Sequence, residues 1–212
     1  MDLHPNPCPN SDTISIFHLN IRSLRSKISY LSEIASEYDV LCLTETHLDE
    51  NVASSELEID GYSSDIIRKD RTAHGGGIAL YATNKLHVER QTHLEINNIE
   101  SIWVKITFPH FSFLLCCIYR PPSSTRDFWR NLHISLENAV TENQNIIVTG
   151  DLNTDMLTVR DGDLPDLIQY FQLTNVIHSP TRFGSTRASL LDPILVRECS
   201  VEMSEVIDIE TC

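Results

Sequence analysis

The stretch IIVTGDLN, residues 146 to 153, is an apolar run that stops at a Gly and then presents Asp151 and Asn153 two residues apart. Residues i and i+2 project to the same side of an extended backbone. The carboxylate and the carboxamide can therefore act on one bound group.

Polar side chains recur where other predicted strands end. Asn20 closes TISIFHLN, Glu45 closes DVLCLTE and Tyr119 closes FSFLLCCIY. Each of them alone is more typical of a turn residue or a rim side chain. Together with Asp151 and Asn153 they form the set that a phosphodiester hydrolase needs. It has a carboxylate for Mg²⁺ or Mn²⁺, a carboxylate to orient or deprotonate water, and neutral donors for the charged phosphate.

A scaffold of strands and helices must bring these side chains together. Besides the strands above, GGGIALYAT, ESIWVKITF and ASLLDPILV read as strands. Residues 22–38, DFWRNLHISLENAV and DLPDLIQYFQL carry apolar residues at helical spacing. Strands outnumber helices and several follow one another directly. The pattern therefore favours two packed sheets with helices outside over a strictly alternating parallel sheet.

Length and composition are typical of one globular domain, since the chain has 212 residues of which 41% are hydrophobic. The Pro- and Asn-rich residues 1–12 are predicted to be a disordered lead. No stretch approaches the roughly 20 apolar residues that cross a bilayer, and no signal peptide is evident, so an intracellular protein, nuclear or cytoplasmic and neither secreted nor in a membrane, is expected. The six cysteines show no C-x-x-C spacing, which predicts buried reduced thiols.

The net charge of −14, from 16 Lys and Arg against 30 Asp and Glu, argues against strong non-specific affinity for nucleic acid. It does not exclude a nuclease, because clustered acids hold divalent cations and a local basic rim can still form.

The series LNIRSL, LTETHL, GGGIALY, IESIWVKI, IYRPP, VTGDLN, SPTRF and SLLDPIL resembles the endonuclease/exonuclease/phosphatase superfamily. It is most similar to the apurinic-type endonuclease domains of non-LTR retrotransposons, from about Ile14 to Leu195. The resemblance implies an α/β (α+β) fold, a four-layer α/β/β/α sandwich of two packed mixed sheets flanked by helices. It also implies a hydrolase that depends on Mg²⁺ or Mn²⁺ and nicks DNA.

The resemblance assigns roles to the residues at the strand ends. Glu45 becomes the principal metal ligand, with Asn20 supporting the metal or the phosphate. Asp151 would orient or activate the attacking water, and Asn153 would hydrogen-bond the phosphate as negative charge builds on it. Tyr119 would contact the phosphate or help the leaving oxygen.

Four further residues receive roles from the same resemblance. Arg120 is expected to bind the substrate as a charge partner beside Tyr119, and Thr181 and Arg182 are expected to contact DNA. Asp192 matches the family acid that orients a catalytic histidine. Glu100 also belongs to the matched motifs, although an acid at the start of a strand can simply cap it.

The chain departs from the family at its end. Family members follow the acid at the position of Asp192 with a final strand and a Ser-Asp-His motif, and the sequence ends at EVIDIETC without them. The domain, residues 13–212, is therefore expected to be C-terminally incomplete and to lack its last strand. Neither His47 nor His178 stands in a matching context. Either the chain is a piece of a longer protein, or it is a copy that has lost catalysis.

Three functions stay open at this point. The first is a DNA-nicking endonuclease of retrotransposon type, for which DNA is the substrate and a fused downstream reverse transcriptase is a candidate partner. The second is a non-catalytic remnant or binding module. The third is a superfamily phosphatase or RNA exonuclease. The sequence makes no prediction of oligomeric state.

Overall fold

The structure is a computed structural model that describes residues 13–184 and 187–207, so the predicted disordered lead lies outside the described residues. The described part contains three α-helices and two short 3-10 helices: α1 (Leu24–Ala35), α2 (Asp127–Glu142), α3 (Asp163–Tyr170), η1 (Ser54–Leu57) and η2 (Thr92–Leu94).

The strands form two mixed sheets and a separate hairpin. The smaller sheet has four strands, in the order β1 (Ile16–Asn20), β2 (Val40–Thr44), β4 (Ile78–Ala82) and β3 (Ile67–Lys69). The larger sheet has six, in the order β5 (His87–Arg90), β6 (Glu100–Thr107), β7 (Ser112–Tyr119), β8 (Ile146–Asp151), β12 (Ile194–Arg197) and β9 (Thr174–Asn175). The hairpin consists of β10 (Arg182–Phe183) and β11 (Ala188–Ser189).

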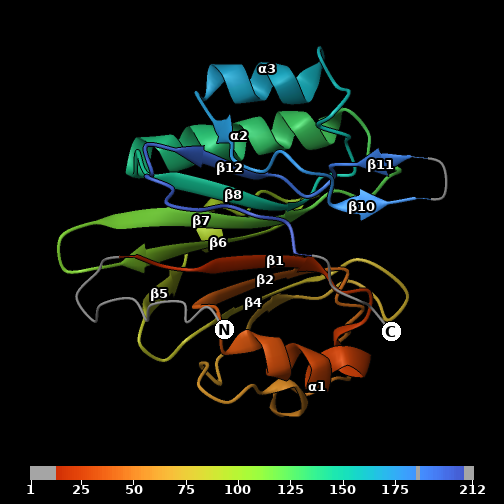
Figure 1. The fold of residues 1–212 in the computed structure, drawn as a ribbon, viewed down its shortest axis with the longest axis vertical. Coiled ribbons are helices and arrows are strands. Elements are labelled where there is room, and N and C mark those ends of the chain that lie inside the picture. Colours follow the sequence, from red (N-terminus) through yellow and green to blue (C-terminus); the bar gives the residue numbers. More distant parts are fainter. Residues whose placement is uncertain (1–12, 185–186, 208–212) are drawn as a thin grey trace, which may run out of the picture.

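The two sheets pack face to face, with α1 below the smaller sheet and α2 and α3 above the larger one (Figure 1). Three hydrophobic clusters fill the spaces between these layers. Strand β7 lies in the middle, so both of its faces are buried and its sequence is an unbroken apolar run. Cys116 packs in the cluster under α2, and Cys117 packs in the cluster between the sheets. Both thiols are buried and free, as the sequence predicted.

Each sheet contains one parallel strand pair that is joined through a helix. Strands β1 and β2 are connected by α1, and β7 and β8 are connected by α2. A crossover of this kind brings the carboxyl ends of both strands to the same edge of their sheet, where ligands bind in open α/β sheets. The two helical crossovers therefore explain why the polar residues at four strand ends gather at one place.

Pro193 lies immediately before β12. Strand β12 begins one residue later, at Ile194, and pairs with β8 on one side and β9 on the other. The missing N–H of Pro193 thus falls outside the strand ladder.

No helix in the described part of the chain has the length and apolar character of a membrane span.

Candidate active site

Glu45 directly follows β2 and has donors at both carboxylate oxygens. The N–H of Gly76 donates to Oε2 at 2.8 Å, and His47 Nε2 lies 2.9 Å from the same oxygen. The hydroxyl of Tyr119 donates to Oε1. Burial by itself raises the pKa of Glu45, but hydrogen bonds from Tyr119, Gly76 and His47 outweigh burial and hold the pKa below its ordinary value. Glu45 is therefore an anion at neutral pH.

Tyr119 is the last residue of β7 and reaches from the larger sheet to Glu45, which follows a strand of the smaller sheet. Burial and the Glu45 carboxylate raise the pKa of the Tyr119 phenol above its ordinary value. The phenol consequently keeps its proton and acts as a hydrogen-bond donor.

Asp151, the last residue of β8, connects the two sheets through Asn20 at the end of β1. Asn20 Nδ2 donates to Asp151 Oδ2 at 2.7 Å, and the backbone N–H of Asn153 donates to Asp151 Oδ1 at 2.9 Å. The side chain of Asn153 in turn donates to the carbonyl of Arg120 at 2.8 Å. The predicted pair from TGDLN is therefore a fixed turn in which both side chains are held by neighbours.

Asp192 lies just before β12 and is held by Thr181. The Thr181 hydroxyl donates to Asp192 Oδ2 at 2.7 Å, and its oxygen accepts from the N–H groups of Leu191 and Asp192. These contacts make Thr181 a support for Asp192, and its predicted contact with DNA stays a prediction.

His18 is the histidine that the structure places beside Asp192, and sequence reasoning missed it. Its Nδ1 lies 3.7 Å from Asp192 Oδ1, its Nε2 lies 3.3 Å from Thr44 Oγ1, and its side chain is 5% exposed. Burial lowers the pKa of His18 to about 4, so the imidazole is neutral at pH 7. One signal in the sequence was available, since His18 precedes Asn20 by two residues and so shares its face of β1.

Asp151 and Asp192 are close enough to influence each other. Burial raises the pKa of Asp151, and the negative charge of Asp192 raises it further. Burial likewise raises the pKa of Asp192. Two neighbouring buried carboxylates resist being ionised together and tend to share a proton. A carboxylate whose pKa has moved toward neutrality is suited to take a proton from water.

The donor set at the strand ends fits a hard divalent cation. Asn20 Oδ1 is buried and has no hydrogen-bond partner among the described residues, although it is an oxygen acceptor next to Asp151. Glu45 and Asp151 add carboxylates. The described residues include no cluster of three or more His, Cys, Asp or Glu that would enclose a metal. Mg²⁺ usually keeps several waters and takes only one or two protein carboxylates, so this open set suits it.

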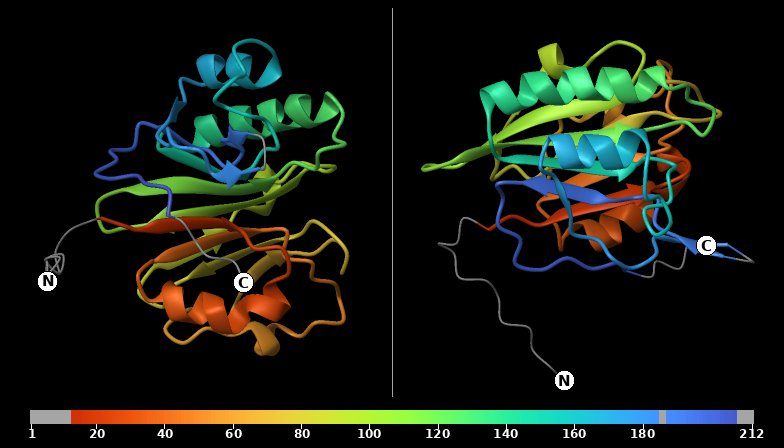
Figure 2. Two further views of the ribbon diagram at one scale, coloured as in Figure 1. Left: turned by 45° about the vertical axis from the view of Figure 1, so that its right-hand side comes forward. Right: turned by 90° about the horizontal axis from the view of Figure 1, so that it is seen from above.

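The two arginines predicted to meet the substrate occupy different environments. The guanidinium of Arg120 lies 5.0 Å from the ring centre of Trp129, and its Nη1 donates to the carbonyl of Leu152 at 3.3 Å. Arg120 therefore supports the turn after β8. Arg182, in contrast, is exposed at the start of the hairpin of β10 and β11, next to Phe183, whose side chain is 72% exposed. Figure 2 shows this hairpin projecting from the body of the molecule.

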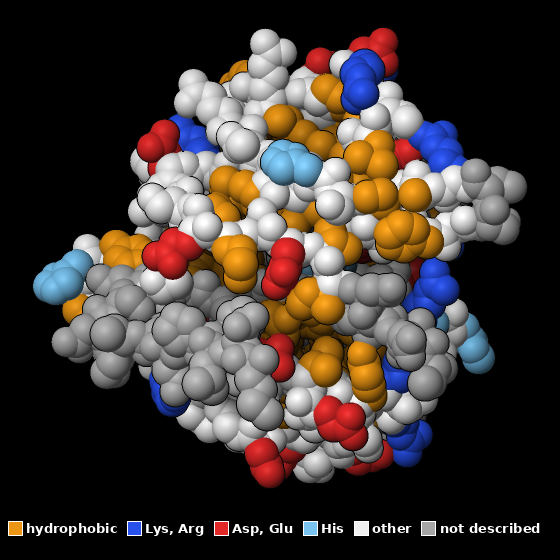
Figure 3. All heavy atoms as spheres, viewed as in Figure 1, with side chains coloured by type: hydrophobic (Ala, Val, Ile, Leu, Met, Phe, Trp, Pro, Cys, Tyr) orange, Lys and Arg blue, Asp and Glu red, His pale blue; other side chains and the backbone are white. Residues whose placement is uncertain are grey.

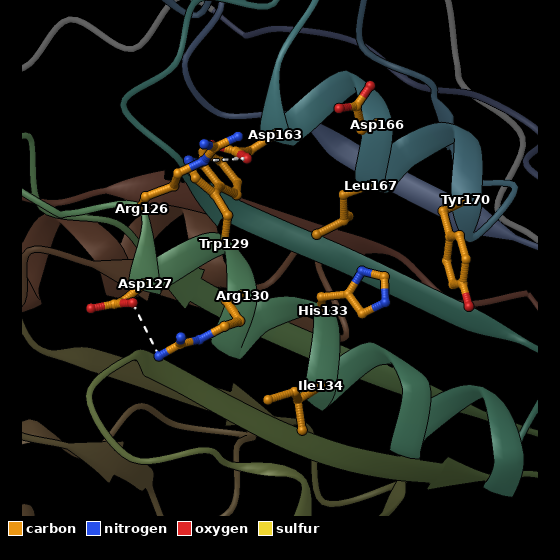
Figure 4. A pocket seen from close by; sticks show the side chains of 10 residues that line it. All are labelled: Arg126, Asp127, Trp129, Arg130, His133, Ile134, Asp163, Asp166, Leu167 and Tyr170. Carbon is orange, nitrogen blue, oxygen red and sulfur yellow. Dashed lines mark hydrogen bonds and ion pairs between the residues drawn. The ribbon is translucent and has the colours of Figure 1, made fainter.

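A groove of about 500 Å³ lies elsewhere, between α2 and α3 on the outer side of the larger sheet (Figure 4). Its floor includes Trp129 and Leu167, and an ion pair between Arg126 and Asp163 crosses one end. None of the predicted site residues lines it, so the groove is separate from the strand-end cluster.

Known proteins share this architecture. A structure of the endonuclease domain of TRAS1, a telomere-specific non-LTR retrotransposon, superposes with a TM-score of 0.64 at 14% identity, covering 86% of this chain and 83% of that one. An AP endonuclease, LMAP from Leishmania major, gives 0.66 at 16% identity over 86% and 78% of the two chains. The 3' phosphatase NExo from Neisseria, bound to a product DNA hairpin, gives 0.61 at 15% identity over 88% and 87%.

No curated protein sequence matches the chain significantly. At these identities the structural matches establish the fold, which is that of the AP endonucleases. The sequence model of the endonuclease/exonuclease/phosphatase family matches residues 17–197, which is most of the chain. The chain therefore belongs to the endonuclease/exonuclease/phosphatase family.

Proposed function

We propose that this protein is a divalent-metal-dependent phosphodiester hydrolase that nicks DNA, an endonuclease of retrotransposon type. The observation that carries the proposal is the cluster of Asn20, Glu45, Tyr119, Asp151 and Asn153 at neighbouring strand ends, connected across the two sheets by hydrogen bonds. The likeness to the TRAS1 endonuclease domain supports the choice of DNA and of the retrotransposon type.

Glu45 and the free amide oxygen of Asn20 would hold Mg²⁺ or Mn²⁺. When bound, the cation supplies positive charge that neutralises the phosphate and its leaving oxygen. Asp151 orients the attacking water and takes its proton, for which its raised pKa is suitable. Asn153 donates to the phosphate oxygens as charge develops there. Tyr119 would turn its single O–H from Glu45 to the phosphate once a cation occupied the Glu45 carboxylate. Arg182 contacts the DNA backbone, while Arg120 and Thr181 hold Asn153 and Asp192 in place.

Whether the protein is active depends on the histidine that Asp192 orients. Its histidine neighbour among the described residues is His18, whose imidazole is buried and contacts Thr44 instead of an open surface. We propose that a solvent-facing Ser-Asp-His of the family type is needed for full activity. If the protein lacks such a motif, the alternative is a non-catalytic binding module.

The experiment is nicking of supercoiled plasmid in Mg²⁺ or Mn²⁺. It compares this chain, its Asp151→Ala variant, and a form extended through any downstream Ser-Asp-His. Loss of the proton-transfer group should lower the rate by roughly 10²–10⁴-fold. Asp161→Ala is the matched control, since Asp161 is an exposed acid in the same β8–α3 connection and should leave nicking unchanged. If no folded form nicks although Mn²⁺ binds, the endonuclease proposal is wrong and the binding module replaces it.

A second candidate, a phosphatase that removes a terminal phosphate, is favoured by the likeness to the Neisseria 3' phosphatase. A DNA hairpin with a 3' phosphate separates the two activities. Release of inorganic phosphate without plasmid nicking would select the phosphatase. Shortening of an RNA oligonucleotide under the same conditions would select the RNA exonuclease.

A further inference from the structure

Glu100 is a partly buried acidic residue beside the site, and the proposed reaction does not use it. It begins β6 and pairs in register with Tyr119 of β7, which itself pairs with Asp151 of β8. Its side chain is 17% exposed. Three neighbouring strands of the larger sheet thus present an acid, a phenol and an acid in one row. Of these three residues, only Glu100 has no role in the proposed reaction.

Two consecutive glycine amides connect Glu100 to Glu45. The N–H of Gly76 donates to Glu45 Oε2 at 2.8 Å, and the N–H of Gly77 donates to Glu100 Oε2 at 2.8 Å. Because these amides are adjacent in the chain, a bond that fixes one of them restricts the other. Glu45 follows a strand of the smaller sheet and Glu100 lies in the larger sheet, so the two glycines connect the sheets at the site.

The carbonyls of the same two glycines bond to the chain segment that carries Glu45. The N–H of His47 donates to the Gly76 carbonyl at 3.0 Å, and the N–H of Thr46 donates to the Gly77 carbonyl at 3.3 Å. Both N–H groups and both carbonyls of the pair are therefore engaged. The segment after β2 cannot shift without breaking several of these bonds.

The backbone at these two positions favours glycine. Gly76 and Gly77 have φ values of +74° and +88°. A Cβ at Gly77 would lie 2.5 Å from Thr46 Oγ1, and a Cβ at Gly76 would lie 2.5 Å from Arg71 Cδ. The GGG run of the sequence therefore allows the backbone to approach both glutamates closely.

Arg71 holds the second oxygen of Glu100. Its Nη1 donates to Glu100 Oε1 at 2.9 Å, and it is the charged partner of a carboxylate that faces another carboxylate, Glu45. Burial raises the pKa of Glu100, the Gly77 N–H and Arg71 lower it, and the charge of Glu45 raises it again. Glu100 therefore has one oxygen on Gly77 and the other on the cationic Arg71, and we assign it no role as a cation ligand.

We propose that Glu100 is a positioning residue that fixes the Glu45 carboxylate through the Gly76–Gly77 amides, and thereby sets the affinity of Glu45 for its divalent cation. The inference rests on the proposed function, in which Glu45 holds that cation. Residues that hydrogen-bond to a ligand's surroundings typically change metal affinity by roughly 10–100-fold when they are removed.

The test compares two variants, one that changes the length of the Glu100 side chain and one that changes its charge. Glu100→Asp keeps the charge but is one methylene too short to reach the Gly77 amide. Glu100→Gln keeps the length and an acceptor oxygen but removes the charge. The dissociation constant for Mn²⁺ is measured by electron paramagnetic resonance of the free ion. Exchange of the Gly77 amide is followed by NMR, and thermal unfolding shows that each variant is folded.

We expect Glu100→Asp to weaken Mn²⁺ binding by roughly tenfold and Glu100→Gln by less than about threefold. Exchange of the Gly77 amide should accelerate in the Asp variant alone. The inference is wrong if both folded variants bind Mn²⁺ like the wild type, or if Gln loses more affinity than Asp, since charge rather than position would then matter. If the wild type itself binds no Mn²⁺, it is the proposed function that fails, and the inference with it.

Discussion

Two of the residues at the site, Glu45 and Asn153, have left-handed backbones with φ values of 56° and 46°. Such a conformation costs a glutamate roughly 1–3 kcal/mol, whereas asparagine tolerates it better. The hydrogen bonds on the Glu45 carboxylate and on the Asn153 side chain hold these conformations in place. Both residues come just after a strand, so the unusual backbone turns their side chains toward the other site residues.

The carboxyl pair of Asp151 and Asp192 leads to a prediction for stability. Because burial raises the pKa of both groups to about 6, the folded chain still binds a proton at pH 5, where the unfolded chain has already lost it. The pair's contribution to stability is therefore complete below the pKa of a free aspartate, about 3.9, and is lost as pH rises through the folded value. His18 changes stability in the opposite direction with pH. Because burial lowers its pKa, protonation of His18 at low pH favours the unfolded chain.

Asp192→Asn isolates the carboxyl pair from His18, since the amide keeps an acceptor for Thr181 and removes one charge. We expect the metal-free variant to be more stable than the wild type at pH 7, by on the order of 1–2 kcal/mol. The difference should disappear near pH 4. Urea unfolding in the presence of a chelator at both pH values measures it. An equal difference at pH 7 and pH 4 would contradict the proposed protonation of the pair.

At the scale of elements, the close approach of β7 to β8 brings Tyr119 next to Asp151. Gly150 lies in β8 with φ +146°, and a Cβ at this position would lie 1.8 Å from the carbonyl oxygen of Ile118 in β7. The glycine of TGD therefore allows two parallel strands to pack closely beneath the site.

Gly150→Ala should destabilise the protein by about 3 kcal/mol or more, because a methyl group there collides with the backbone of a central strand. Urea unfolding measures the change. Gly75→Ala is the matched control, since a Cβ at Gly75 meets no atom within 4 Å, and a change of within about 0.5 kcal/mol is expected. Comparable losses in the two variants would show that β7 and β8 are not as close as described.

At the scale of the whole molecule, charge opposes the proposed substrate. The net charge is −14, and on the face drawn in Figure 3 the described Lys and Arg side chains lie near the margins without forming a broad basic patch. Contact with DNA then depends on a few local cations. The hairpin of β10 and β11 offers Arg182 beside the exposed Phe183 and begins directly after Thr181, which contacts Asp192.

Arg182→Gln should weaken DNA binding and reduce the slope of log affinity against log salt by about 1, because one phosphate contact is lost. Fluorescence anisotropy with a labelled duplex, titrated at several salt concentrations, provides both values. Arg25→Gln on α1, below the smaller sheet, is the control and should leave the slope unchanged. A slope that responds to Arg25 and not to Arg182 would place DNA on another surface.

The sequence by itself determined the α-helices, most of the longer strands and the family. The spacing of apolar residues can be read from neighbouring positions, because it reflects which face of an element is buried. It predicted all three α-helices of the described part and most strands of more than three residues. The short strands β3, β9, β10 and β11 escaped prediction, because pairing with a partner far along the chain defines them more than their own two or three residues do.

Only the tertiary structure decided how the polar residues are connected. The spacing of Asp151 and Asn153 placed them on one side of a strand. However, the contacts of Asn20 with Asp151 and of Tyr119 with Glu45 join residues of different sheets. The place of His18 beside Asp192 and the commitment of Arg120 to Trp129 likewise depend on how layers pack. Such contacts arise from the geometry of the packed sheets, and neither residue type nor local spacing encodes them.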